Sequence, residues 1–286
     1  MQIVVTGGEG QLGKSLRHVL ETNPELADIK ATFIDLKELD LTNFGKVDDF
    51  FAHYRCDLVV NCAAYTDVEK AEMDYENALK VNCEALGNLA YASVKHNFRI
   101  IHISTDYVFD GKKDSPYEPE DVADPQTAYG KSKLAGEKIL MEINPESLII
   151  RTSWLYSPYG KNFFLTMRDR AIKRLASSVV ADQTGSPTSA HNLANAILHI
   201  AESGKWISGI YHFTDGGATT WFTFAKEIYF LAGADERLVS PVSTEEYGSS
   251  VVRPKYSVLN KTKIIDNYGV PVVGWEESLK QIFEWT

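Results

Sequence analysis

Short apolar runs alternate with helical patterns through the first half of the chain. The runs rich in Val, Ile and Leu cover 2–6, 29–35, 57–61, 99–105 and 147–153. Apolar residues at helical spacing follow the first run at 11–22, and a long amphipathic stretch covers about 75–96. Continuous apolar runs, each followed by a helix, are typical of a parallel sheet buried on both faces. The sequence therefore predicts an α/β fold with a doubly wound parallel sheet.

A glycine fingerprint, Gly7-x-x-Gly10-x-x-Gly13, stands between the first predicted strand and the helix that follows it. Gly7 permits a tight turn, Gly10 lets the backbone approach a pyrophosphate, and Gly13 allows the helix to pack closely on the strand. The N-terminus of that helix then faces the phosphates. Although the spacing is a variant of G-x-G-x-x-G, its place between strand and helix predicts a Rossmann-type dinucleotide site.

Asp35 ends the second predicted strand, where an acidic residue is expected to bind the adenosine ribose. A carboxylate there disfavours a 2′-phosphate, whereas Lys37 lies two residues further on and offsets part of that repulsion. NADH and NADPH therefore both stay open as the cofactor. After the third clear strand, the small residues of NCAAYT (61–66) allow the backbone to run close to the cofactor.

Tyr129 and Lys133 stand four residues apart in QTAYGKSKLAGEKIL, so one helix face carries both side chains. A phenol ordinarily titrates near ~10. Since a fixed positive charge favours the phenolate, we expect Lys133 to lower the pKa of Tyr129 towards neutrality. Behind a nucleotide-binding fingerprint, this pair predicts a proton donor beside a nicotinamide.

A polar cluster follows the strand at 99–105, at the sheet edge where open α/β sheets bind ligands. Among Asn61, Ser104 and Thr105, we select Thr105 as the hydroxyl that orients a substrate carbonyl. The predicted step is hydride transfer between nicotinamide and a carbonyl carbon. In that step Tyr129 gives its proton to the developing alkoxide, and Lys133 also holds the nicotinamide ribose.

The second half of the chain is less regular. Its expected elements are a turn-rich loop at 181–190, an apolar helix to about 201, a strand at 209–215, a helix at 221–233, mostly loop at 241–259, and a final helix at 275–285. Because no long linker or internal repeat separates the halves, we expect the second half to pack on the first as a smaller substrate-binding lobe. The predicted division assigns 1–155 and 178–202 to the dinucleotide-binding domain, and 156–177 and 203–286 to the lobe.

Charge and composition exclude several classes of protein. The net charge of −10 argues against nucleic acid as a partner. No apolar run approaches the ~20 residues needed to cross a bilayer, and the N-terminus reads as a strand instead of a signal peptide. We therefore expect a cytoplasmic protein with no membrane partner. The three cysteines lack metal-ligand spacing and are expected to be reduced thiols.

Eight stretches occur in an order that resembles the extended short-chain dehydrogenases/reductases, and among them the dTDP-4-dehydrorhamnose reductases. They are TGGEGQLGKSL, NCAAYTDVEKAE, STDYVFDG, YGKSKLAGE, RTSWLY, KNFFLTM, VVADQTGSPT and RPKYSVL, and they span residue 6 to about 260. The resemblance implies NAD(P)H-dependent reduction of the 4-keto group of dTDP-4-dehydro-L-rhamnose. The product, dTDP-L-rhamnose, serves polysaccharide biosynthesis.

The resemblance also implies roles for individual residues. Contacts with the cofactor are implied for Gly10, Gln11, Leu12, Asp40, Leu41, Ala64, Tyr65 and Thr66. Thr105, Asp106, Tyr107 and Trp154 are implied to meet the sugar. An indole face at Trp154 suits the apolar side of a deoxysugar, and Arg253 is the candidate for the substrate diphosphate.

The sequence differs from the family pattern at one position that bears on how the protein assembles. Some members of the family dimerise through a metal held by glutamates, but here His191 follows PTSA. We therefore predict no metal, and a monomer or weak homodimer. Two other functions stay open: a nucleotide-sugar epimerase or dehydratase of the same fold, and a non-catalytic regulatory subunit resembling the methionine adenosyltransferase β subunit.

Overall fold

A six-stranded parallel sheet forms the centre of the computed structural model, which describes residues 1–285. Its strands are β1 (Gln2–Thr6), β2 (Lys30–Ile34), β3 (Leu58–Asn61), β4 (Arg99–Thr105), β5 (Leu148–Thr152) and β10 (Gly209–His212). They lie in the order β10-β5-β4-β3-β1-β2, and every neighbouring pair is parallel. The predicted doubly wound α/β fold is confirmed.

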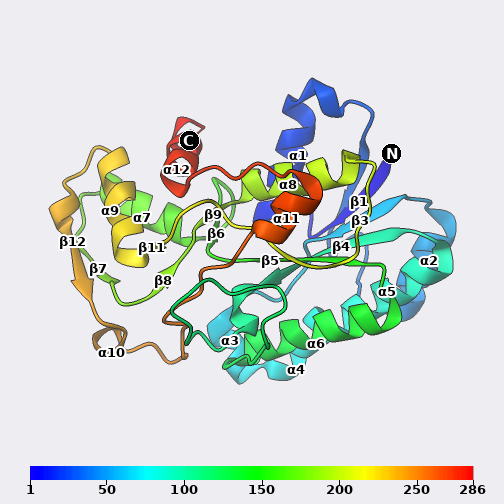
Figure 1. The fold of residues 1–286 in the computed structure, drawn as a ribbon, viewed down its shortest axis with the longest axis horizontal. Coiled ribbons are helices and arrows are strands. Elements are labelled where there is room, and N and C mark those ends of the chain that lie inside the picture. The colour runs from blue at the N-terminus through cyan, green and yellow to red at the C-terminus, as the bar shows by residue number, and fades with distance from the viewer. Residues whose placement is uncertain (286) are drawn as a thin grey trace.

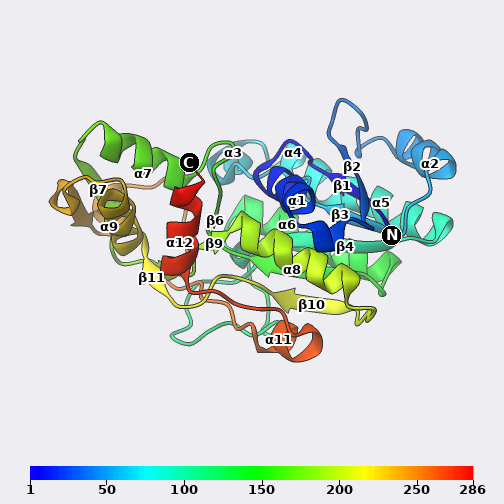
Figure 2. The ribbon, with the colours of Figure 1, turned by 90° about the horizontal axis from the view of Figure 1, so that it is seen from above.

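Helices cover both faces of this sheet (Figures 1 and 2). One face carries α1 (Gln11–Thr22) and α8 (Ala190–Glu202), and the other carries α2 (Phe44–His53), α5 (Ala85–His96) and α6 (Ala128–Ile143). Successive strand side chains point to opposite faces. In β1, Ile3 and Val5 accordingly join the core under α1, whereas Val4 joins the core under α2 and α5.

The strand order reverses beside β1, because the chain runs from β1 outward to β2 and then crosses back to β3. In sheets of this kind, the carboxyl ends of the strands at such a reversal form the ligand-binding crevice. The glycine fingerprint follows β1 directly, and the polar residues at 104–107 end β4. The fold therefore brings both predicted motifs to one edge of the sheet.

The amphipathic stretch predicted at about 75–96 is not one regular helix. It contains α4 (Tyr75–Leu79), a π-helical segment η2 (Lys80–Glu84) and α5. The amide of Asn82 in η2 holds the backbone N–H and carbonyl of Tyr65 and donates to Ser132 Oγ. A Cβ on Gly136 would lie 2.1 Å from the Asn82 carbonyl oxygen, so α6 packs closely on this widened turn. π-segments often mark functional sites.

The smaller lobe has its own apolar core. It is built from α7 (Phe163–Ile172), β7 (Ser177–Val180), α9 (Trp221–Leu231), β12 (Val239–Val242) and α12 (Trp275–Glu284). The remaining short elements are η1 (Pro24–Leu26), α3 (Val68–Met73), η3 (Asp106–Val108), β6 (Leu155–Tyr156), β8 (Thr184–Gly185), β9 (Thr188–Ser189), β11 (Thr219–Thr220), η4 (Glu236–Leu238), α10 (Thr244–Tyr247) and α11 (Thr262–Tyr268). The core of the lobe buries Phe164, Phe224 and Leu279. Figure 1 shows the lobe beside the sheet, with β12 at its far end.

Two features of the second half differ from the sequence prediction. The predicted strand at 209–215 exists as β10, but it pairs with β5 in the main sheet, although 203–286 was assigned to the lobe. The apolar pattern identifies a strand and cannot specify its partner. Within the predicted loop 241–259, the end of β12 pairs with β7, and α10 forms one helical turn. Within residues 1–285, no helix combines the length and apolarity needed to cross a membrane.

Candidate active site

A cavity of about 840 Å³ opens at the carboxyl ends of β1, β3, β4 and β5, and residues of the lobe form its opposite wall. It brings together nearly all the residues predicted from the sequence. Those on its wall are Gly7, Gly10, Gln11, Leu12, Asp35, Asp40, Leu41, Ala64, Thr66, Thr105, Asp106, Tyr107, Tyr129, Lys133, Trp154 and Arg253. Tyr65 is not among the wall residues and packs beside Tyr129 and Ala71.

The glycine loop has the shape of a phosphate cradle. Gly7 has φ of 64°, and a Cβ there would lie 2.8 Å from the Ala63 nitrogen. A Cβ on Gly13 would lie 2.5 Å from the Gly7 carbonyl oxygen, so α1 can approach β1 only with glycine at this position. Gly10 is the N-cap of α1 and supplies no side-chain hydrogen bond. The first amides of α1 are therefore donors that suit a pyrophosphate.

Two carboxylates, Asp35 and Asp40, lie on the cavity wall where the sequence predicts the adenosine. Asp35 accepts hydrogen bonds from the Glu9 backbone at 3.0 Å and from its neighbour Leu36 at 2.8 Å, which tie β2 to the glycine loop. Asp40 accepts from the Thr42 hydroxyl at 2.7 Å and backbone N–H at 3.0 Å, and these bonds lower its pKa. Lys37, which was expected to offset the charge of Asp35, does not line the cavity as the described residues form it.

Tyr129 and Lys133 lie in the first two turns of α6, and both are buried. The side chain of Thr127 accepts from the Gly130 backbone and fixes the start of this helix at the cavity. Lys133 Nζ donates to the Ile103 carbonyl at 2.7 Å and lies 3.2 Å from His102 Nε2. The helix thus places both predicted side chains against the end of β4.

The expected effect of Lys133 on Tyr129 is corrected by this geometry. Burial raises the pKa of Tyr129 well above its usual value, and the hydrogen bond with Thr105 is the influence that lowers it. The nearby Asp106 carboxylate raises that pKa further. Because Lys133 Nζ is held on the Ile103 carbonyl and beside His102, it does not act as the lowering charge. The phenol is therefore protonated at neutral pH.

Thr105 is the hydroxyl that the structure leaves in contact with Tyr129. Of the two alternatives, Ser104 donates its hydroxyl to Glu137 Oε1 at 2.5 Å, and Asn61 is bound within the sheet to Thr6 and His102. Thr105 Oγ1 donates to Asp106 Oδ1 at 3.0 Å. Burial raises the pKa of Asp106 to about 6, so its carboxylate is an available acceptor at neutral pH.

Part of the cavity wall is aromatic. Trp154, with φ of 47°, stacks its indole on that of Trp221, the first residue of α9. A Cβ on Gly185 would lie 2.6 Å from the Trp154 ring, so glycine is needed beside it. Sequence reasoning missed Trp221 because the stretch at 221–233 showed only a helical pattern. Other wall residues that it missed are Asn162, Phe163, Gln183 and Ser257.

Gln11 joins the glycine loop to the lobe. Its Oε1 accepts from Asn162 Nδ2 at 2.8 Å and from the Ser157 hydroxyl at 3.1 Å. Asn162 also caps α7 by accepting from the Leu165 backbone. The side chains of Gln11 and Asn162 therefore connect the start of α1 to the start of α7, the first helix of the lobe.

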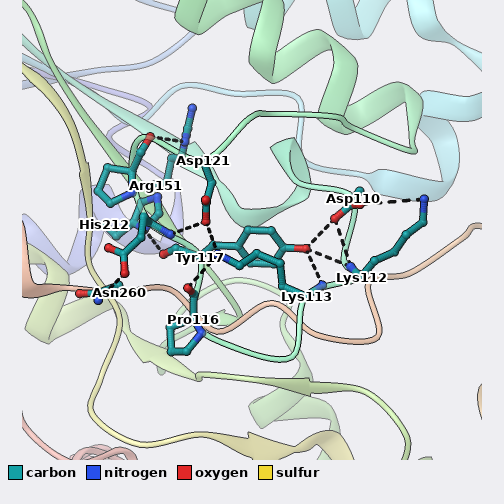
Figure 3. Close-up of polar contacts among 11 residues, drawn as sticks. Asp110, Lys112, Lys113, Pro116, Tyr117, Asp121, Arg151, His212 and Asn260 are labelled. Carbon is teal, nitrogen blue, oxygen red and sulfur yellow. Dashed lines mark hydrogen bonds and ion pairs between the residues drawn. The ribbon is translucent and has the colours of Figure 1, made fainter.

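A cluster of polar contacts surrounds Tyr117 (Figure 3). Through its backbone, Tyr117 also holds the segment that follows Arg253. Tyr117 Oη donates to Asp110 Oδ1 at 2.6 Å and accepts from the Lys112 backbone at 2.9 Å. The Tyr117 backbone bonds to Val258 and Asn260, so the chain at 258–260 runs beside 117. A few residues before this segment, Arg253 lies on the cavity wall and donates to Tyr107 Oη at 3.3 Å and to Glu69 Oε1 at 3.1 Å.

His191, which follows PTSA, lies between the aromatic rings of Trp285 and His18. Its imidazole centroid is 4.2 Å from the ring of Trp285 and 5.9 Å from that of His18. Burial and the neighbouring His18 lower the pKa of His191 to about 4. The side chain is therefore neutral at physiological pH and packs as an aromatic.

The whole chain matches a known family. The family model described as the RmlD substrate binding domain matches residues 1–286. The dTDP-4-dehydrorhamnose reductase of Aggregatibacter actinomycetemcomitans is 38% identical over 98% of both chains. The enzyme of the same name from Salmonella typhimurium is 36% identical over 99% of this chain and 97% of that protein.

Solved structures give the same result. A dTDP-4-dehydrorhamnose reductase from Clostridium acetobutylicum superposes with a TM-score of 0.93 at 38% identity, covering 100% of this chain and 99% of that one. The enzyme from Bacillus anthracis, solved in complex with NADP, has a TM-score of 0.93 at 39% identity and the same coverage. Sequence and structure together show that this chain belongs to the dTDP-4-dehydrorhamnose reductase family.

Proposed function

We propose that the protein reduces the 4-keto group of dTDP-4-dehydro-L-rhamnose with NADH or NADPH, giving dTDP-L-rhamnose. The observation that carries the proposal is the placement of Thr105, Tyr129 and Lys133 on the wall of one cavity with the glycine loop. The family relationship supports the choice of a nucleotide sugar as substrate.

The proposed chemistry divides between cofactor and protein. The bound cofactor supplies the hydride that adds to the carbonyl carbon. Tyr129, which burial keeps protonated, transfers its phenolic proton to the carbonyl oxygen, so carbonyl, hydride and proton together give a secondary alcohol. Thr105 exchanges its hydrogen bond to Asp106 Oδ1 for one donated to that oxygen, and so orients it. Lys133 holds the nicotinamide ribose.

The lobe is proposed to hold the rest of the substrate. Trp154 offers an indole to the apolar side of the deoxysugar, and Asp106 and Tyr107 meet its polar side. Arg253 pairs with the diphosphate by exchanging its contact with Glu69, which is largely exposed. We also propose that the chain divides into the cofactor-binding domain and the lobe predicted from the sequence, except that β10 belongs to the cofactor-binding domain because it pairs with β5.

A coupled assay tests this function. The 4-keto sugar is made in situ by the upstream dehydratase and epimerase, and NADH or NADPH absorbance is followed. The proposal predicts stoichiometric cofactor consumption that requires the sugar. Purified protein that retained cofactor and consumed none while converting the sugar would favour the epimerase or dehydratase alternative. Cofactor binding with no conversion of any nucleotide sugar would favour the regulatory-subunit alternative.

We propose that the protein is cytoplasmic and is a monomer or weak homodimer. Sedimentation velocity over a hundredfold range of concentration tests the oligomeric state, and cell fractionation tests the location.

A further inference from the structure

A buried polar chain connects Lys133 to the middle of the sheet. His102 on β4 lies with Nε2 3.2 Å from Lys133 Nζ and with Nδ1 2.9 Å from Asn61 Nδ2 on β3. Asn61 Oδ1 accepts the hydroxyl proton of Thr6 on β1 at 2.6 Å. All four side chains are at least 97% buried. The chain thus runs through three adjacent strands and ends at a residue of the proposed catalytic site.

The hydrogen bonds of Asn61 fix the tautomer of His102. A neutral imidazole has one N–H and one acceptor nitrogen. The Asn61 oxygen is engaged by the hydroxyl of Thr6, so its NH₂ group faces His102 and donates to Nδ1. The imidazole proton then resides on Nε2, the nitrogen that faces Lys133. An N–H directed at Nζ favours the neutral amine over the ammonium ion.

We propose that Asn61 and His102 form a positioning pair that controls the protonation of Lys133 through the tautomer of the imidazole. This inference rests on the proposed function only in giving Lys133 a role in turnover. Neither residue touches the reacting atoms in this scheme. Both act on Lys133, His102 by facing it directly and Asn61 through the imidazole.

The surroundings make Lys133 responsive to such control. Burial is the main influence that lowers the pKa of Lys133 to about 8, whereas Glu137 and Cys62 raise it. Burial and the charge of Lys133 hold the pKa of His102 well below its usual range, so the imidazole stays neutral. Glu137 is itself bound to Arg151 and Ser104, and Tyr129 stays protonated. Among these neighbours, His102 and Ile103 are the ones whose hydrogen-bonding atoms meet Nζ.

The experiment measures Lys133 itself. The full-length protein is labelled with ¹³C at lysine Cε, the signal is assigned with Lys133→Arg, and its titration is followed by NMR. Asn61→Asp places a carboxylate that can only accept, so the imidazole proton moves to Nδ1 and Nε2 accepts from the ammonium. We expect the midpoint to rise by about one pH unit or more. The same substitution in a His102→Leu background retains the added charge but has no donor or acceptor at position 102 to switch.

The double variant decides the inference. We expect Asn61→Asp to shift the midpoint less than half as far in the His102→Leu background, and equal shifts in the two backgrounds would overturn the proposal. Should Asn61→Asp not fold, His102→Leu alone removes the Nε2–H and raises the midpoint, and an unchanged midpoint would overturn the proposal. In turnover assays, the alkaline limb of the pH profile moves with the NMR midpoint. A shifted midpoint in protein that never turns over the sugar would reject the proposed function and leave the pair standing.

Discussion

The indole rings of Trp154 and Trp221 stack with centroids 3.6 Å apart and planes inclined by only 10°. Trp154 follows β5 of the main sheet, whereas Trp221 begins α9 of the lobe. The stack joins the two parts of the chain at the wall proposed to receive the sugar. It also packs against Phe163, whose ring centroid is 4.6 Å from that of Trp221.

Removing one partner of this stack tests its part in substrate binding. We expect Trp221→Ala to raise KM for the nucleotide sugar by roughly 2- to 12-fold, because an aromatic pair is worth about 0.5–1.5 kcal/mol. KM for the cofactor should be unchanged. Phe230→Ala, on the exposed side of the same helix, is the matched control. Equal effects on both KM values would mean that the stack supports folding alone.

Tyr129→Phe removes the proposed proton donor while leaving the ring and its edge contact with Tyr107. We expect kcat to fall by about 10²- to 10⁴-fold, the usual contribution of general acid catalysis. The cofactor should still bind, as measured by fluorescence titration. Tyr91→Phe, at an exposed site, controls for the substitution. Retained turnover would remove Tyr129 from the mechanism.

We expect Asp35 to influence the choice between NADH and NADPH. Its carboxylate repels a 2′-phosphate, and no charge from Lys37 reaches the cavity wall among the described residues. Asp35→Ser should therefore shift the ratio of kcat/KM values towards NADPH by at least roughly tenfold. Steady-state kinetics with both cofactors measure the ratio. Asp28→Ser, outside the cavity, should leave it unchanged.

Arg151 and Glu137 form a buried ion pair with two hydrogen bonds, at 2.6 and 2.9 Å. Arg151→Met leaves the carboxylate of Glu137 buried without its charge partner. The free energy of unfolding should fall by about 3–5 kcal/mol. Lys173→Met, which breaks the exposed pair with Asp169, should cost under about 1 kcal/mol. Denaturant titrations compare the two, and similar losses would contradict the assignment.

Asp215 should make stability depend on pH. Burial raises its pKa to about 7, although it accepts hydrogen bonds from the Ser189 backbone and the Asn192 amide. The folded protein therefore keeps this proton up to about pH 7, whereas the unfolded chain releases it near ~4. Raising the pH through this window removes stability. As the pH rises from 4.5 to 8, the Tm of Asp215→Asn should increase by several degrees relative to that of the wild type. The Tm of the control Asp169→Asn should follow that of the wild type over the same range.

The sequence predicted those parts of the fold that depend on residues close together in the chain. The main strands are buried apolar runs, and the glycine positions are required by backbone contacts within one β–α unit. Tyr129 and Lys133 share a helix face, which spacing alone reveals. The direction of Lys133 Nζ depends instead on where β4 ends, so the expected lowering of the Tyr129 pKa was wrong.

Long-range contacts account for what could not be predicted. The stack of Trp154 on Trp221 exists only after the lobe docks, and His102 is one polar residue within the apolar run RIIHIST. The strand pattern at 209–215 was recognised, but its partner β5 lies about 60 residues earlier. Such pairings depend on the whole topology, which periodicity does not encode.

The position of β10 has a consequence for how the protein is made. The outer strand of the sheet, and α8 that covers one face, come from residues 190–212, after the chain has already entered the lobe through α7. On the ribosome, the first five strands of the sheet emerge without these partners, and the edge of β5 that pairs with β10 waits for more than fifty residues of further synthesis. The nascent protein therefore exposes an unpaired strand edge during that interval, the kind of edge that invites chaperone binding or aggregation.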